Sequence, residues 1–256
     1  DFGSDVSGQG NDLTDVNLTA ADQATDTPTN NFCTINSLDN FYQAATFSEG
    51  NNHITLPQNS TNPYNTSTFH VSAGKWYWET LLKNTGTADT WYQVVGIAGG
   101  PCTGTTNGLI ANLYNWAIYN AGGNIYLRNN DVDVGGWSGV TFIQGDIIGI
   151  ALDLVNNNLY FHLNGTYMNS GVPTSGATGT GAASITAAAS TTFGGYTASF
   201  GQMSNLASQW EANFGGSSPF TISSGNADGN GYGNFEYAVP DGYLALCTKN
   251  LGSDGG

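Results

Sequence analysis

The side chains best suited to catalysis in this sequence are its carboxylates and histidines. Hydrolysis of a glycosidic bond needs two carboxylates held at a defined separation. Four acids are available for such a role: Glu79, Asp153, Glu211 and Glu236. Nothing in their spacing pairs them. The three histidines are isolated from one another, and the sequence has neither a Gly-x-Ser-x-Gly elbow nor an HExxH motif. We therefore predict that the protein is not an enzyme.

One short run has the spacing of cation ligands. Asn226, Asp228 and Asn230 carry side-chain oxygens at alternate positions before Gly231. Oxygen ligands placed in this way resemble the start of a calcium loop. Glu236 falls one position short of the twelfth, where an EF-hand places its bidentate glutamate. A Gly/Asn turn without metal is the alternative. We hypothesise a calcium site at Asn226, Asp228 and Asn230, and no cofactor is otherwise required.

Large aromatic side chains are candidates for binding sugars, because ring faces pack against the C–H surfaces of pyranoses. Trp137 is the first candidate, since its neighbours Gly135, Gly136, Ser138 and Gly139 favour an exposed position. The other candidates lie near predicted loops or strand ends: Trp91, Tyr114 and Trp116. Burial in a β-sandwich interior is the alternative for each of them.

Composition indicates a folded chain with few charges. Of the 256 residues, 39% are hydrophobic and 12% aromatic, which is enough apolar surface for a core. Only 9% are charged, against about 25% in a typical soluble protein. The net charge is −15, and the only bases are Lys75, Lys83, Arg128 and Lys249. Binding to nucleic acid or to anionic lipid needs a basic surface, so both are excluded as partners.

The cysteines and the apolar runs give little information about the cellular compartment of the protein. Cys33, Cys102 and Cys247 are widely spaced and form no CxxC motif, which argues against zinc. Three buried free thiols are favoured over one disulfide with a leftover thiol. No apolar run approaches the ~18 residues of a membrane span, so we expect no membrane insertion. Because Asp1 is the first residue, we expect the chain to be one piece of a longer polypeptide.

Period-2 patterns dominate the middle of the chain. Residues 75–82 alternate as a half-buried strand, and 91–98 form a second β-rich run. Residues 116–119 and 125–127 flank a Gly-Gly hairpin signal. Residues 145–154 and 159–163 alternate again, and the second run ends at Asn164-Gly165, the favoured pair for a type I′ turn. Many short strands joined by turns predict an antiparallel sandwich.

The flanking regions have weaker patterns. We predict an irregular, Asn/Thr-rich connector over residues 1–68, with short strands near 32–35 and 53–56. Residues 171–199 favour a long surface loop, followed by a strand near 196–200. Residues 204–213 favour a short helix, because Leu206 and Trp210 are four positions apart. The sandwich is assigned to residues 69–216. A Gly/Asn-rich extension over 217–256 is expected to pack back on it.

Four segments, taken in order, resemble the signatures of the SPRY domain family. They are Lys75-Trp76-Tyr77-Trp78-Glu79, Val95-Gly96-Ile97, the run from Gly145 to Asp153, and the run from Leu159 to Gly165. The resemblance implies an all-β, antiparallel β-sandwich of the SPRY or concanavalin-like jelly-roll kind. It also implies an interaction function, because SPRY domains bind partners through variable loops at one end. Because these loops vary, no binding residue of the family can be assigned to a position in this sequence.

The flanks suggest a setting for this domain. Residues 5–14, 26–34 and 233–251 look like segments of structural proteins from marine-type bacteriophages. This resemblance implies a subunit of a virion appendage, such as a tail fibre, spike or capsid fibre, located on the virion or outside the cell. Its expected partners are a host cell-surface glycan or protein and other virion proteins, in a homo-oligomer for which we predict a trimer by analogy. The alternatives are a cellular adhesin or filament subunit and a secreted glycan-active enzyme.

Overall fold

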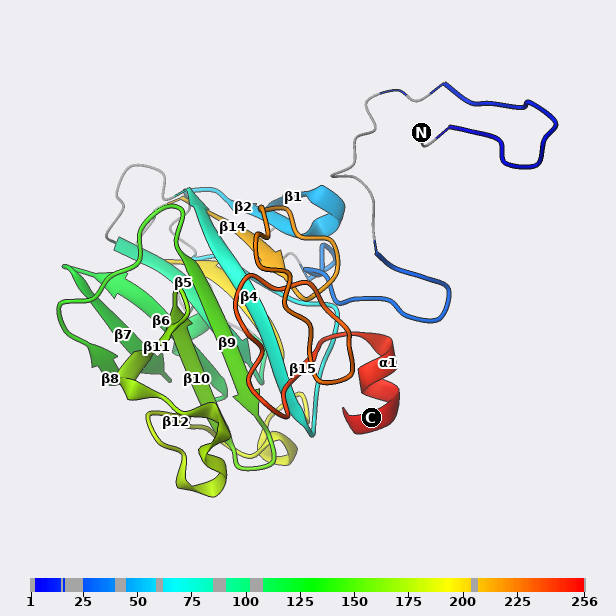
Figure 1. The fold of residues 1–256 in the computed structure, drawn as a ribbon. Helices are drawn as coiled ribbons and strands as arrows, with labels where there is room; N and C mark the ends of the chain where they lie inside the picture. Colours follow the sequence, from blue (N-terminus) through cyan, green and yellow to red (C-terminus); the bar gives the residue numbers. More distant parts are fainter. Residues whose placement is uncertain are drawn as a thin grey trace.

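The structure is a computed structural model that describes residues 3–14, 16, 25–39, 45–58, 62–84, 91–101, 108–203 and 207–255. Two β-sheets pack face to face in these residues (Figure 1). All strand pairs are antiparallel except that of β15 with β4. The all-β sandwich predicted from the alternating segments is confirmed.

The larger sheet has nine strands in the described part of the chain. Its main path is β1 (Thr46–Ser48), β2 (His53–Leu56), β14 (Ser208–Asn213), β4 (Lys75–Asn84), β9 (Ile147–Asp153), β10 (Asn158–Leu163) and β11 (Thr166–Tyr167). Two short strands join it from the side: β12 (Ala183–Ser184) pairs with β10, and β15 (Leu244–Ala245) with β4.

The smaller sheet has six strands in the described residues. In order they are β3 (Tyr64–Thr66), β13 (Thr197–Gln202), β5 (Trp91–Ala98), β6 (Asn115–Ala121), β7 (Asn124–Asn129) and β8 (Val132–Trp137). Strand β8 is therefore an edge. Short helical segments lie in the connections: η3 (Glu49–Asn51), η4 (Leu109–Ala111), η5 (Met168–Ser170), η6 (Pro173–Thr178), η7 (Ala188–Ser190), α1 (Thr248–Asn250) and η8 (Leu251–Gly255). Among the described residues no helix could span a membrane.

The predicted alternation builds the core between the sheets. From β4, Trp76 and Trp78 point inward and are fully buried, and Trp210 of β14 belongs to the same cluster. Strands β9 and β10 contribute Ile150 and Phe161 to it. The turn after β10 has Asn164 at φ 48° and Gly165 at φ 82°, the left-handed conformations that a type I′ turn requires. The hairpin predicted there is confirmed.

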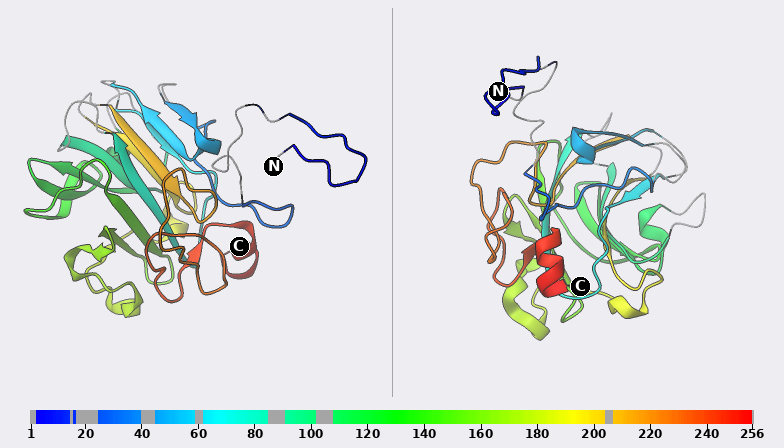
Figure 2. Two further views of the ribbon diagram at one scale, coloured as in Figure 1. Left: turned by 45° about the horizontal axis from the view of Figure 1, so that its top comes forward. Right: turned by 90° about the vertical axis from the view of Figure 1, so that its right-hand side faces the viewer.

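Strand β4 is buried on both faces, which the period-2 pattern did not predict. Tyr77 lies on its outer face and packs with Tyr160, Phe235 and Tyr243 in a second apolar cluster. Phe235 and Tyr243 come from the C-terminal extension, which crosses the outer face of the larger sheet (Figure 2). The half-buried strand predicted for residues 75–82 was wrong because a segment distant in sequence covers its second face.

Other expectations need correction in the flanks. The helix predicted over residues 204–213 is wrong: residues 208–213 form β14, since Trp210 pairs with Ile54 of β2 and Leu82 of β4. Leu206 lies outside the described residues. Residues 171–199 are not all surface loop, because Ile185 and Ala188 are buried there. In place of a strand at 32–35, Phe32 and Ile35 form isolated bridges. Strands β1, β2 and β3, from the predicted connector, belong to the two sheets.

Cys33 and Cys247 are free and buried, as predicted. Burial raises the pKa of both thiols, so both are held as thiols. Cys102 lies outside the described residues.

Candidate functional site

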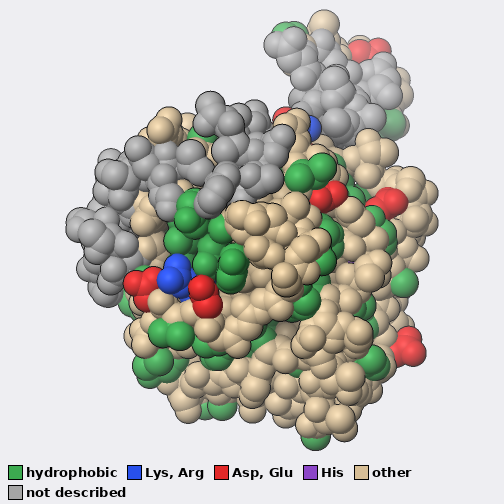
Figure 3. Space-filling model, turned by 90° about the vertical axis from the view of Figure 1, so that its left-hand side faces the viewer, with side chains coloured by type: hydrophobic (Ala, Val, Ile, Leu, Met, Phe, Trp, Pro, Cys, Tyr) green, Lys and Arg blue, Asp and Glu red, His purple; other side chains and the backbone are tan. Residues whose placement is uncertain are grey.

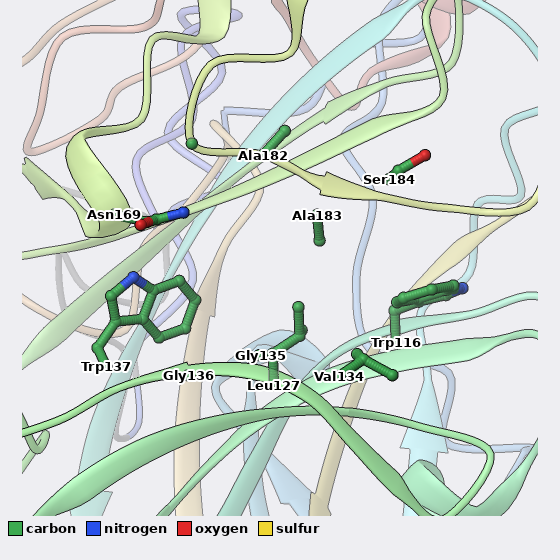
Figure 4. Close-up of a pocket in the computed structure, with 11 residues that line it drawn as sticks. Trp116, Leu127, Val134, Gly135, Gly136, Trp137, Asn169, Ala182, Ala183 and Ser184 are labelled. Atoms are coloured by element: carbon green, nitrogen blue, oxygen red, sulfur yellow. The ribbon is translucent and has the colours of Figure 1, made fainter.

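A cleft of about 330 Å³ opens between the edges of the two sheets (Figure 4). One wall is β8, and the other is residues 181–184, which include β12. Trp116 and Trp137 lie at opposite ends of this cleft, with Leu127 between them (Figure 4). Two of the aromatic residues singled out in the sequence are thus brought together.

The two indoles combine support from the core with partial exposure. Trp116 projects from β6 and Trp137 from the end of β8, and both pack against the main core cluster. The Nε1 atom of Trp137 is buried and has no hydrogen-bond partner among the described residues. The Nε1 atoms of Trp116 and of the core residue Trp78 are likewise buried and unpaired, and each such donor costs about 1–3 kcal/mol.

The rest of the cleft is neutral. No charged side chain lines it in the described residues, and its polar side chains are Asn169 and Ser184. Gly135 and Gly136 leave the backbone of β8 bare along the wall. Such a surface suits an uncharged group with some hydrogen-bonding capacity.

A second hollow of about 410 Å³ lies along the same strand. It shares Gly135, Gly136 and Trp137 with the cleft, but Tyr126 and Asp133 also line it. Tyr126 belongs to the outer face of the smaller sheet and Leu127 to its inner face, so the two hollows flank β8 on opposite sides. We name them the inner cleft and the outer hollow.

Asp133 is the charged residue that lines the outer hollow in the described residues. Tyr119 donates its hydroxyl to Oδ1 of Asp133 at 3.1 Å, and Nε of Arg128 lies 3.3 Å from the same oxygen. Burial, followed by the Asp133 carboxylate, raises the pKa of Tyr119 to about 12. Figure 3 shows this side of the molecule, where few charged groups interrupt a largely neutral surface. With Asp131 also beside Arg128, the local excess is acidic.

The remaining aromatic candidates do not join the cleft. Tyr114 is partly exposed just before β6, but it is not among the lining residues. Trp91 begins β5, where its backbone pairs with Ala121, and its side chain lies outside the described residues.

The calcium candidates form a loop held by hydrogen bonds. Asp228 is buried, and its Oδ1 accepts the N–H groups of Asn230 and Tyr232, each at 2.9 Å. Its Oδ2 accepts the N–H of Ala245 at 2.9 Å and the Nδ2 of Asn250 at 2.7 Å. Asn226 forms a bridge with Phe235. Each Asp228 oxygen therefore already has two donors, and a cation would have to displace them. The calcium hypothesis stays a hypothesis.

Glu79, one of the acids considered for catalysis, anchors the C-terminal extension. It is fully buried and accepts the backbone N–H groups of Glu236 at 2.9 Å and Tyr237 at 2.7 Å. Tyr77 donates its hydroxyl to Glu79 at 2.9 Å. Burial raises the pKa of Glu79, and the donated hydrogen bonds oppose that rise.

His162 extends this network. Its Nε2 lies 2.8 Å from the Tyr77 hydroxyl oxygen, and its Nδ1 accepts the N–H of Gly165. Because Tyr77 donates to Glu79, the Nε2 of His162 is the donor to Tyr77. Burial lowers the pKa of His162 to about 4, so the ring is neutral at pH 7. A Cβ on Gly149 would lie 1.8 Å from Nε2, so the ring fits only beside a glycine.

The other acids also have structural partners. Asp153 pairs with Lys75 at 2.9 Å, and Glu211 with Lys83 at 3.1 Å. Glu236 accepts hydrogen bonds from Ser223 through both oxygens. Each of the four acids is thus engaged in holding the fold, and the prediction of no enzymatic activity stays a prediction.

Several lining residues of the inner cleft were missed by the sequence analysis. Asn169 and residues 181–184 lie in or beside a stretch of Gly, Ala, Ser and Thr without periodicity. No pattern there could place them opposite Trp116 and Trp137. The alternation of 125–127 could have placed Leu127 on the core face beside them.

Comparison with known proteins identifies the family. Residues 75–202, half of the chain, match the SPRY domain. The chain therefore belongs to the SPRY domain family, a class of general protein-interaction modules.

One solved structure agrees on the fold. The SPRY domain of human HERC1 is similar, with a TM-score of 0.51 and 16% sequence identity, over 70% of this chain and 96% of that one. The PSpry domain of TRIM65 matches with a TM-score of 0.45 and 12% identity, over 71% of this chain and 92% of that one. No curated protein matches the sequence. None of these matches indicates a viral or bacteriophage source.

Proposed function

We propose that this SPRY domain is a recognition module that binds a partner protein at the inner cleft. The observation that carries the proposal is the cleft's position between two sheet edges, with the half-buried indoles of Trp116 and Trp137 lining it. A rigid aromatic group beside exposed backbone is the kind of anchor on which protein interfaces depend. Since no charged residue lines the cleft in the described residues, the group that enters it is uncharged.

A neutral glycan is the second candidate ligand. The observation that favours it is the pair of indoles, Trp116 and Trp137, at the two ends of one cleft. Their ring faces could pack against pyranose rings, and Asn169 and Ser184 could hydrogen-bond to hydroxyls.

A virion appendage is the proposed setting, and it rests on the resemblance of the flanking segments to bacteriophage structural proteins. The neighbouring genes test it: virion genes on both sides would support it, and genes of a cellular surface or secretion system would favour an adhesin.

The experiment compares binding by the wild type and by Trp137→Ala, using a random peptide display library and a bacterial glycan panel. We expect selective binding by the wild type and loss in Trp137→Ala. Phe193→Ala is the matched control, since Phe193 is an aromatic residue 37% exposed outside the cleft. Equal binding by wild type and Trp137→Ala would refute the cleft as the binding site. Repeating the measurement with calcium and with EDTA tests the calcium hypothesis.

A further inference from the structure

The free edge of β8 can accept another strand. Val132 is 58% exposed and Val134 47%, and within the described chain β8 pairs only with β7. The turn between these strands is Asn130-Asp131, with φ 49° and 63°, so Asn129 and Val132 close a two-residue hairpin. The two residues that close such a hairpin are hydrogen-bonded to each other, and the next opposed pair along the strands, here Arg128 and Asp133, is not. The backbone N–H and C=O of Asp133 therefore point to the open edge.

The two hollows give this edge places for side chains. Successive side chains of a β-strand point to opposite faces, at a spacing that a neighbouring strand shares. The side chains of a strand added at β8 would therefore point alternately into the inner cleft and into the outer hollow. Gly135 and Gly136 make both hollows accessible, because neither contributes a side chain that would fill them.

The hollows differ in charge, and that difference defines the ligand. The inner cleft is lined by Trp116, Leu127 and Val134 and holds no charge among the described residues. The outer hollow contains the Asp133 carboxylate, whose side chain is 42% exposed, and although Arg128 pairs with one of its oxygens, Asp131 beside Arg128 leaves an acidic excess there. The whole chain carries a net charge of −15, which favours a basic partner further.

We infer that β8 binds an extended polypeptide segment by strand addition, with uncharged apolar side chains in the inner cleft and basic side chains in the outer hollow. This inference rests on the proposed function and specifies its ligand. Backbone hydrogen bonds to the edge give affinity, and the two hollows give specificity.

The sequence of β8 lacks most of the devices that protect edge strands from pairing. Edge strands that are protected from pairing carry lysines, prolines or bulges. Strand β8 has no lysine or proline, and its only charge is Asp133. One bulge falls at Val134, after which Gly135, Gly136 and Trp137 follow β7 in regular register.

The experiment uses a fluorescein-labelled peptide of alternating valine and lysine, and measures fluorescence polarisation with the full chain. Three matched peptides separate the contributions. One has every second backbone amide N-methylated, one replaces lysine with glutamine, and one has the same composition in blocks. We expect the methylated and block peptides to bind at least about tenfold more weakly. Equal binding of the methylated peptide would overturn strand addition.

Two pairs of variants locate the binding. A Cβ at Gly135 would sit 3.7 Å from the Leu127 side chain, an ordinary contact, so Gly135→Phe can fill the inner cleft without strain at its Cβ. We expect it to abolish binding, whereas Val155→Phe, which adds the same ring at a position 67% exposed elsewhere, keeps it. Asp133→Asn should weaken binding of the lysine peptide but not of the glutamine peptide, and Asp241→Asn, the same change at an exposed position outside both hollows, serves as its control. Unchanged binding in Gly135→Phe would overturn the inference.

The outcomes also separate this inference from the proposed function. If no peptide binds but a glycan does, and Trp137→Ala abolishes that binding, the cleft is the site and strand addition is wrong. If Trp137→Ala leaves all observed binding unchanged, both are wrong.

Discussion

The loop of residues 226–232 and strand β8 are both short, glycine-rich and placed at the margin of the sandwich, yet their polar groups differ. In the loop, Asp228 is 6% exposed and accepts four hydrogen bonds. At β8, the Trp137 indole N–H has no partner in the described residues, and the strand edge is open. A saturated carboxylate holds the chain in place, whereas an open strand edge beside a cleft is available to a ligand. We therefore assign a scaffold role to the loop and a binding role to β8.

The largest effect on stability is expected for Asp228→Ala. This change leaves the N–H groups of Asn230, Tyr232 and Ala245 and the Asn250 amide without their acceptor. We expect the free energy of unfolding to fall by about 3 kcal/mol, measured by urea denaturation. The exposed Asp241→Ala in the same extension should change it by less than about 0.5 kcal/mol. Equal effects would contradict the scaffold role.

The buried network at Glu79 predicts a dependence on pH. The folded-state pKa of His162 is about 4, against an ordinary value of 6.5. The unfolded state therefore binds the proton more tightly, and the stability due to neutral His162 is fully present above pH 6.5. It declines as pH falls from 6.5 toward 4, by at most about 3 kcal/mol.

Urea denaturation of the wild type and of His162→Gln between pH 7 and pH 5 checks this dependence. Stability of the wild type should fall across this range, and the variant should lose much of the slope. Identical slopes would show that His162 is not the group responsible.

Trp137→Ala should affect stability less than Asp228→Ala does. The indole is partly exposed, so its removal should lower the free energy of unfolding by about 1–2 kcal/mol. Binding, by contrast, should be lost. Thermal denaturation and peptide binding measured on one sample separate the two effects. A variant that unfolds as readily as Asp228→Ala would place Trp137 with the scaffold.

The smallest effect is expected from calcium. Because N–H donors already occupy both oxygens of Asp228, we expect the Tm to be the same in calcium and in EDTA. A ligand that binds only the folded state raises Tm in proportion to its occupancy. A clear rise that Asp228→Asn removes would establish a calcium site in the loop and reverse the assignment.

Local patterns predicted part of this structure. Alternation in residues 75–82, 145–154 and 159–163 predicted β4, β9 and β10, because each strand buries one face in the core that its own residues build. Asn164-Gly165 predicted the turn, since its positive φ angles favour these residue types.

Long-range packing accounts for what the sequence did not reveal. The cover over Tyr77 comes from Phe235 and Tyr243, in a segment without periodicity. The Leu206–Trp210 spacing favoured a helix, but pairing with β2 and β4 outweighed that weak preference. For the site, Trp116 and Trp137 could be proposed individually. They face one cleft because β6, β7 and β8 pair in one sheet, whereas the Gly- and Ala-rich residues around β12, which form the opposite wall, give no signal in the sequence.

The most direct test of the binding role of β8 is the NMR spectrum of the tryptophan indole N–H groups during titration with the alternating valine–lysine peptide. The chain has six tryptophans, so the buried Trp76, Trp78 and Trp210 serve as internal references. We expect the Trp137 signal to shift most and the Trp116 signal less, while the three buried signals stay in place. Binding of the peptide without a shift of the Trp137 signal would contradict the binding role of β8.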